Sequence, residues 1–171
     1  MPRLLGLAQA SKLYRALPDV AALKPRFTKA GNEIAIGTIG DSSTSEGPFW
    51  ETMNAAGVLQ VPMLMSVWDD GYGISVPKKY QTTKASISTA LSGMQMQEGT
   101  NGIVIYRVKG WDYPALVKTY EEAAKRCREH HVPLLVHVEE VTQPQGHSTS
   151  GSHERYKSKE RMAWAKEYDC I

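Results

Sequence analysis

The chain has no apolar run that approaches the roughly 20 consecutive apolar residues needed to cross a bilayer. Its opening stretch, MPRLLGLAQASKLYR, contains one early arginine and an interrupted apolar segment. That pattern is typical of an amphipathic helix rather than of a signal peptide. We therefore expect no membrane partner and a cytoplasmic location.

Cysteine is scarce, and positive charge is not in excess. Cys127 and Cys170 are too few for a framework of disulfides, and neither has the spacing of a metal ligand, so we expect a reducing compartment. The formal net charge is +2, and Lys and Arg are scattered along the chain. This pattern lacks the massed basic surface of nucleic-acid-binding proteins, and we expect no nucleic-acid partner.

Length and composition are those of an ordinary globular domain, with 171 residues, 42% of them hydrophobic and 22% charged. We therefore predict a single domain over residues 1–171. The sequence stops straight after a helical pattern and without a capping residue, so we expect a piece of a longer polypeptide.

Strand-like and helix-like segments alternate along the chain. Short apolar runs predict strands at residues 33–40, 63–68, 103–108 and 134–138. Helical periodicity predicts an opening helix, a closing charged helix, and helices at 48–59, 87–96 and 113–131. The predicted buried stripe of the helix at 48–59 is Phe49, Met53, Ala56 and Val58. Apolar strands separated by helices indicate a doubly wound α/β fold, a mostly parallel sheet with helices on both faces.

Ligands of such sheets bind beyond the carboxyl ends of the strands, where three loops lie, at residues 40–47, 69–75 and 142–153. In the first loop, Asp41 follows a strand and is positioned to hold a hard divalent cation. Ser42 and Ser43 are small enough to let backbone amides approach an anion at a helix N-terminus. Taken alone, the loop favours the simpler interpretation of an ordinary strand-to-helix turn with Asp and Ser as caps.

The second loop places Asp69 and Asp70 at a strand end, followed by glycines that free the carbonyl groups. This pattern suits an oxygen-ligand site for magnesium or calcium, although a turn with two solvated aspartates is the simpler interpretation in isolation. One helix separates the two loops, so a βαβ unit would bring Asp41 and Asp70 side by side. A Mg²⁺ held there could bridge to a diphosphate lying on the amides of Ser42 and Ser43.

The two loops together resemble the metal motif of thiamine diphosphate enzymes, Gly-Asp-Gly followed roughly thirty residues later by Asn-Asn or a relative. The segment GDSSTSEGPFWETMNAAGVLQVPMLMSVWDDGYGIS resembles the α subunit, or α-like half, of pyruvate and branched-chain 2-oxo acid dehydrogenases. The resemblance extends over nearly the whole chain. Gly110-Trp111-Asp112 and Gly146-His147-Ser148 resemble two further family segments.

The resemblance implies a role for each matching residue. Asp41 would bind magnesium through its side chain, Asp70 would occupy the second ligand position, and Tyr72 would supply a backbone carbonyl. The amides of Ser42 and Ser43 would hold the diphosphate. His147 would reach the diphosphate or the mouth of the site, and it is the one catalytic candidate. The remaining histidines, His130, His131 and His137, are weaker candidates.

The resemblance also implies an activity. The family decarboxylates a 2-oxo acid substrate and passes the acyl group to a lipoyl-bearing acyltransferase, with thiamine diphosphate and Mg²⁺ as cofactors. A β-type subunit or β-like half completes the active site, so we expect an oligomer. Because neither a β half nor the family's upstream contacts are in this sequence, we expect truncation at both ends and a chain that is inactive alone.

Two departures from the motif keep alternatives open. Ser42 replaces the second glycine, which requires a negative φ there. Asp70 replaces a neutral amide and adds a negative charge that a metal ion can offset. A transketolase-like enzyme and a non-catalytic assembly domain that lost the cofactor site are the other interpretations.

Overall fold

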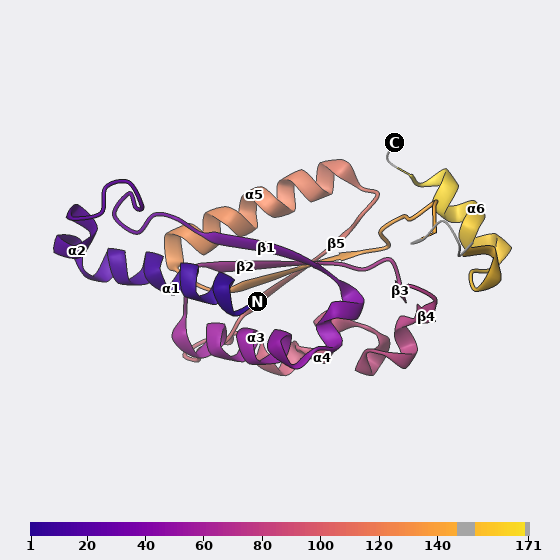
Figure 1. Ribbon diagram of the computed structural model, residues 1–171, viewed down its shortest axis with the longest axis horizontal. Coiled ribbons are helices and arrows are strands. Elements are labelled where there is room, and N and C mark those ends of the chain that lie inside the picture. Colours follow the sequence, from indigo (N-terminus) through magenta and orange to yellow (C-terminus); the bar gives the residue numbers. More distant parts are fainter. Residues whose placement is uncertain (147–152, 170–171) are drawn as a thin grey trace.

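A four-stranded parallel sheet forms the centre of the computed structural model, which describes residues 1–146 and 153–169 (Figure 1). The strands are β1 (Ala35–Gly40), β2 (Met63–Trp68), β5 (Val104–Lys109) and β6 (Leu134–Glu139). Their order in the sheet is β1-β2-β6-β5, and each neighbouring pair is parallel. The predicted α/β fold with a mostly parallel sheet is confirmed.

The helices of the described residues are α1 (Pro2–Ala16), α2 (Pro18–Ala22), α3 (Gly47–Leu59), α4 (Ile87–Ala90), α5 (Tyr113–His130) and α6 (Lys159–Glu167). Short 3₁₀ helices are η1 (Asp41–Ser45), η2 (Lys78–Tyr80), η3 (Thr83–Ala85), η4 (Ser92–Met94) and η5 (His153–Arg155). A small antiparallel hairpin joins β3 (Tyr72–Gly73) to β4 (Val76–Pro77). None of the helices in the described ranges is long and apolar enough to span a membrane.

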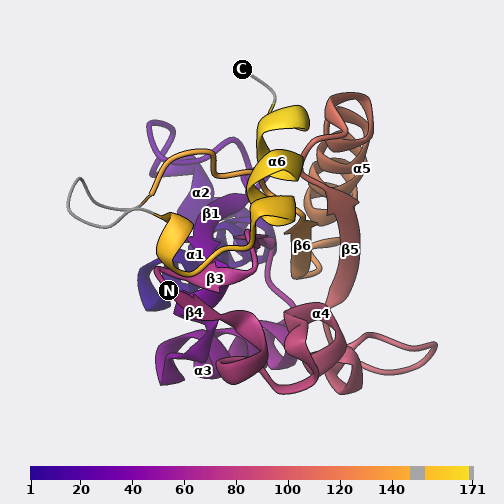
Figure 2. The same ribbon diagram turned by 90° about the vertical axis from the view of Figure 1, so that its right-hand side faces the viewer.

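The core has two layers because successive residues of β2 point to opposite faces of the sheet. Met63 and Met65 are fully buried on the face covered by α1, α3 and α4. Leu64 packs on the opposite face, against a cluster that includes Ala123 and Cys127 of α5. Figure 2 shows α3 and α5 on the two sides of the sheet. Burial raises the pKa of the Cys127 thiol to about 12, so this cysteine is a core residue.

Three details differ from the sequence-based expectations. Val58 was predicted to be buried but is 60% exposed, because it lies about 200° around the helix from Ala56. The helix predicted at 87–96 is only α4 and η4, since the backbone after Met94 pairs with Ile103 instead. Trp68, the last residue of the apolar run predicted as a strand at 63–68, is 52% exposed, whereas the rest of β2 is buried.

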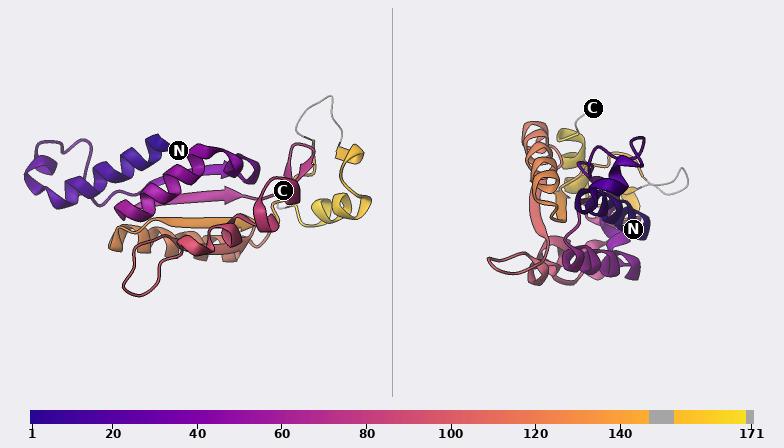
Figure 3. Two further views of the ribbon diagram at one scale, coloured as in Figure 1. Left: turned by 90° about the horizontal axis from the view of Figure 1, so that it is seen from below. Right: turned by 90° about the vertical axis from the view of Figure 1, so that its left-hand side faces the viewer.

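The carboxyl ends of the four strands meet at one end of the molecule. Figure 3 shows the strands running toward this end, with the β3–β4 hairpin and α6 lying beyond them. The loop that follows β1 and the loop that follows β2 are therefore neighbours, as a parallel βαβ unit requires.

Candidate metal and diphosphate site

The loop after β1 buries the carboxylate of Asp41. Gly40 ends the strand, and Asp41 begins η1, so the predicted loop is a turn of 3₁₀ helix. Asp41 is only 5% exposed, and its Oδ2 is a buried oxygen with no hydrogen-bond partner. Ser42 is half-buried and Ser43 is exposed. Ser42 does not adopt a positive φ, so serine fits in place of the motif glycine without strain.

The loop after β2 is folded by its two aspartates. Oδ1 of Asp69 accepts the backbone N–H of Gly71 at 2.8 Å, and Oδ1 of Asp70 accepts that of Tyr72 at 3.1 Å. These are local side-chain-to-backbone turns of the kind that aspartate favours. Oδ2 of Asp70 is then left buried and without a hydrogen-bond partner, as is the corresponding oxygen of Asp41.

The two loops touch at Gly73 and Ser42. A Cβ placed on Gly73 would lie 2.8 Å from Cβ of Ser42, closer than real Cβ contacts come. Glycine is therefore required at this position by close approach rather than by an unusual φ. The contact brings the loop of Asp41 against the loop of Asp70, which the sequence pattern had predicted.

The electrostatics of the site favour a cation. Burial raises the pKa of Asp41 to about 7, and the negative charges of Asp69 and Asp70 add to the effect. Hydrogen bonding from the backbone of Ser42 and the charge of Lys78 oppose it only in part. The nearby lysines offset this negative charge only in part, so a divalent cation would stabilise the ionised form of Asp41.

The donor set fits Mg²⁺, and this fit rests on the two buried carboxylate oxygens that have no hydrogen-bond partner. No group of three or more His, Cys, Asp or Glu side chains suited to a metal ion is present in residues 1–146 and 153–169. Mg²⁺ in phosphate sites usually takes one or two carboxylates and completes its shell with water and phosphate oxygens, so two are enough. Gly71 accepts the N–H of Lys78 at 2.9 Å, so Tyr72 and Pro77 form a non-hydrogen-bonded pair of the hairpin, and the Tyr72 carbonyl is directed away from β4, consistent with the role predicted for it.

A buried network supports the second loop, and sequence reasoning missed it. Oδ2 of Asp69 lies 2.7 Å from Nζ of Lys78 and 3.0 Å from Nε2 of His137. Nδ1 of His137 is hydrogen-bonded to Oγ of Ser88 at 2.9 Å. Burial by itself would raise the pKa of Asp69, but hydrogen bonds from His137 and Lys78 outweigh it and hold the pKa below its ordinary value. Asp69 is thus an ionised anchor for the loop, and Asp70 is the residue left for a ligand.

Two cations of the C-terminal segment lie against the same loop. Nζ of Lys157 is 4.0 Å from Oδ2 of Asp70 and 5.1 Å from the centre of the Tyr72 ring. Nη2 of Arg161 donates to the backbone carbonyl of Asp70 at 2.9 Å and to that of Val141 at 3.4 Å. Burial lowers the pKa of Lys157, whereas the charge of Asp70 opposes this shift.

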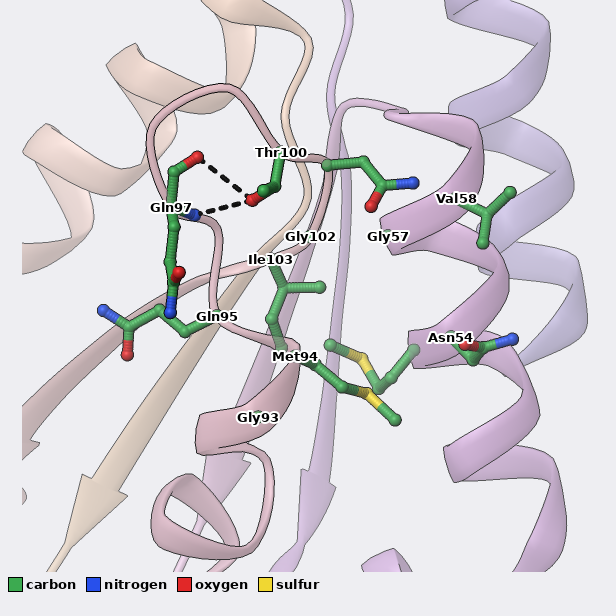
Figure 4. A pocket seen from close by; sticks show the side chains of 12 residues that line it. Asn54, Gly57, Val58, Gly93, Met94, Gln95, Gln97, Thr100, Gly102 and Ile103 are labelled. Atoms are coloured by element: carbon green, nitrogen blue, oxygen red, sulfur yellow. Dashed lines mark hydrogen bonds between the residues drawn. The ribbon is translucent and has the colours of Figure 1, made fainter.

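The cavity at the loop after β2 is small and charged, and Asp41 is not among the residues that line it. It has a volume of about 270 Å³ and is lined by Asp69, Asp70, Gly71, Tyr72, Lys78, Glu140 and Arg161. A larger cavity of about 380 Å³ lies near the amino ends of the strands, between the end of α3 and the segment that leads into β5 (Figure 4). Its wall carries amide side chains such as Asn54, Gln95 and Gln97 and no carboxylate, so it offers no cation site.

The sequence also predicted two further family segments, one at residues 110–112 and one that contains His147. Asp112 of the Gly110-Trp111-Asp112 segment caps α5, because its Oδ1 accepts the backbone N–H of Ala115 at 3.0 Å. Trp111 donates from Nε1 to Glu140 at 2.8 Å, so this segment has a structural part in the loop after β6. His147 lies outside the described residues, and its role stays a prediction.

The whole chain, residues 1–171, matches the family described as "Dehydrogenase E1 component". The chain belongs to this family. Members depend in general on thiamine diphosphate.

Individual relatives are similar along most of the chain. It is 35% identical over 136 residues to "3-methyl-2-oxobutanoate dehydrogenase subunit alpha" of Mycobacterium tuberculosis, covering 78% of this chain and 35% of that protein. It is 32% identical over 165 residues to "Pyruvate dehydrogenase E1 component subunit alpha" of Acholeplasma laidlawii, covering 94% of this chain and 41% of that protein. The α subunit of a Bacillus subtilis acetoin:2,6-dichlorophenolindophenol oxidoreductase is 28% identical over 152 residues, covering 88% of this chain and 43% of that protein. The chain thus spans less than half the length of these relatives.

Proposed function

We propose that this chain binds Mg²⁺-thiamine diphosphate as the α-type part of a 2-oxo acid dehydrogenase E1 component. The observation that carries the proposal is the pair of buried carboxylate oxygens without a hydrogen-bond partner, Oδ2 of Asp41 and Oδ2 of Asp70, on two touching loops. Their position at the carboxyl edge of a parallel sheet is where α/β folds bind ligands. Family membership supplies the identity of the cofactor.

Each site residue has a part in this proposal. Asp41 and Asp70 bind the metal through their carboxylates, and Tyr72 through its backbone carbonyl. The backbone amides of Ser42 and Ser43, at the start of η1, face the diphosphate. When bound, thiamine diphosphate supplies the electron sink for decarboxylation of the 2-oxo acid.

Further partners belong to the proposal as well. A β-type subunit completes the active site in an oligomer, and a lipoyl-bearing acyltransferase receives the acyl group. The chain acts as one domain over residues 1–171, in the cytoplasm, and has no turnover of its own without the β-type partner. Turnover of pyruvate or a branched-chain 2-oxo acid by the purified chain alone would contradict this last point.

The test is a thermal titration of the chain in complex with its β-type partner. A ligand present at a hundred times its Kd stabilises the folded state by about 2.7 kcal/mol, so thiamine diphosphate with Mg²⁺ is expected to raise the melting temperature. Asp41→Ala should abolish this rise, whereas Asp19→Ala, at an exposed position in α2, should leave it unchanged. Absence of a rise with the unaltered chain would favour an assembly domain without cofactor.

A further inference from the structure

Lys157 is a buried cation that faces the loop after β2, which carries Asp70. Its side chain is 2% exposed, and its Nζ lies 4.0 Å from Oδ2 of Asp70, too far for a direct hydrogen bond but close enough for a strong charge interaction. The ring of Tyr72 lies beneath the same ammonium group at 5.1 Å. A lysine is rarely buried so completely unless its charge is used or compensated.

Asp70 creates a charge problem for a diphosphate site. Two carboxylates, Asp41 and Asp70, cancel the two positive charges of a divalent cation, so an anionic diphosphate would approach a centre with no net attraction. One further positive charge next to Asp70 restores that attraction. Of the two cations that contact Asp70, Arg161 donates to backbone carbonyls, whereas Lys157 faces the carboxylate.

We infer that Lys157 is a specificity-determining residue, which offsets the extra negative charge of Asp70 and thereby lets the metal centre accept an anionic diphosphate. The inference rests on the proposed function and deepens it. Lys157 and the metal ion share the carboxylate of Asp70, so the lysine opposes binding of the metal alone and favours binding of the metal together with diphosphate.

In this role Lys157 has two effects of opposite sign. Lys157→Met should weaken thiamine diphosphate binding at saturating Mg²⁺ by roughly tenfold. This loss is smaller than the full interaction energy of two unit charges at short range in a partly buried site. The same change should tighten binding of Mg²⁺ alone, because no ammonium group then competes for Asp70. A lysine with only a packing role would weaken both.

The experiment is a calorimetric titration of the chain in complex with its β-type partner, first with Mg²⁺ alone and then with thiamine diphosphate at saturating Mg²⁺. Lys159→Met is the matched control, because Lys159 is exposed and lies two residues further along the chain. Lys157→Gln, which keeps a polar side chain, is expected to behave as Lys157→Met does. Melting curves without ligand establish that each variant is folded.

A rescue variant completes the design. Asp70→Asn combined with Lys157→Met has the same net charge at the site as the unaltered chain, so it should bind thiamine diphosphate within about threefold of it. If the unaltered chain binds no Mg²⁺-thiamine diphosphate, the proposed function fails. If it binds and both Lys157 variants match Lys159→Met, or if Asp70→Asn gives no rescue, only the role of Lys157 is overturned.

Discussion

Nε2 of His137 lies 3.0 Å from Oδ2 of Asp69, and both side chains are almost completely buried. An ionised carboxylate can only accept, so Nε2–H of His137 is the donor. The bond ties β6 to the loop after β2, while Ser88 ties the other ring nitrogen to α4. The loop that carries Asp70 is therefore held by a hydrogen bond to β6 and, through His137, is linked to α4.

Removing this tie should destabilise the fold. His137→Leu leaves Asp69 buried with one hydrogen bond fewer, and we expect it to lower the free energy of unfolding by about 1–3 kcal/mol. Urea denaturation measures the change. The control is His130→Ala, at an exposed position in the last turn of α5, with an expected change of no more than about 0.5 kcal/mol. Equal losses in both variants would argue against a supporting role for the network.

Asp41 should make the stability of the metal-free chain depend on pH. Its pKa is about 7 in the folded chain against an ordinary value of 3.8. Between these values the folded state holds a proton that the unfolded state has released, so stability falls as pH rises through this window. Asp41→Asn, which mimics the protonated carboxyl group, should flatten the dependence. Melting temperatures from about pH 5 to about pH 8 test this, and parallel curves for both proteins would contradict it.

The β3–β4 hairpin contains a strained residue at its tip. Ile74 has φ 58° and is 65% exposed, an unusual conformation for a β-branched side chain. Ile74→Asn should raise the free energy of unfolding by about 1 kcal/mol, because asparagine tolerates this conformation far better. Ile74→Val keeps the branched side chain and should give no gain. A gain with valine, or none with asparagine, would mean that the turn is not strained.

Close approach at Gly73 should be needed for cofactor binding. In Gly73→Ala the new methyl group meets the side-chain amide of Gln81 and Cβ of Ser42. The flexible Gln81 side chain can move aside, but Cβ of Ser42 is fixed to its backbone, so the two loops must separate. Displacing the support of a metal ligand typically costs ten- to a hundredfold in affinity, and we expect a loss of roughly tenfold or more for Mg²⁺-thiamine diphosphate. Gly93→Ala is the control, since nothing lies within 4 Å of its added Cβ and it lines the distant cavity. Equal affinities for the two variants would show that the loops need not touch.

Sequence reasoning predicted the features that depend on local pattern. Short apolar runs located β1 and β2, and the polar residues after them located the loops of Asp41 and Asp70. Parallel strands joined by one helix have their carboxyl ends at the same edge, so the pairing of the loops followed from topology.

The supporting residues could not be predicted in this way. His137 contacts Asp69 from 68 residues further along the chain, and Ser88 contacts His137 across 49 residues. Neither contact has a local signature, because a histidine within an apolar strand gives no sign of the partner it will meet. Lys157 is likewise one of many scattered lysines until the C-terminal segment is placed against Asp70.

The central claim is that Asp41 and Asp70 hold one metal ion, and anomalous diffraction tests it most directly. Crystals of the chain with its β-type partner, grown with Mn²⁺ in place of Mg²⁺ and with thiamine diphosphate, would show the ion as an anomalous peak. We expect a peak about 2.1 Å from Oδ2 of Asp41 and from Oδ2 of Asp70. A bound cofactor whose ion lies away from both carboxylates would contradict it.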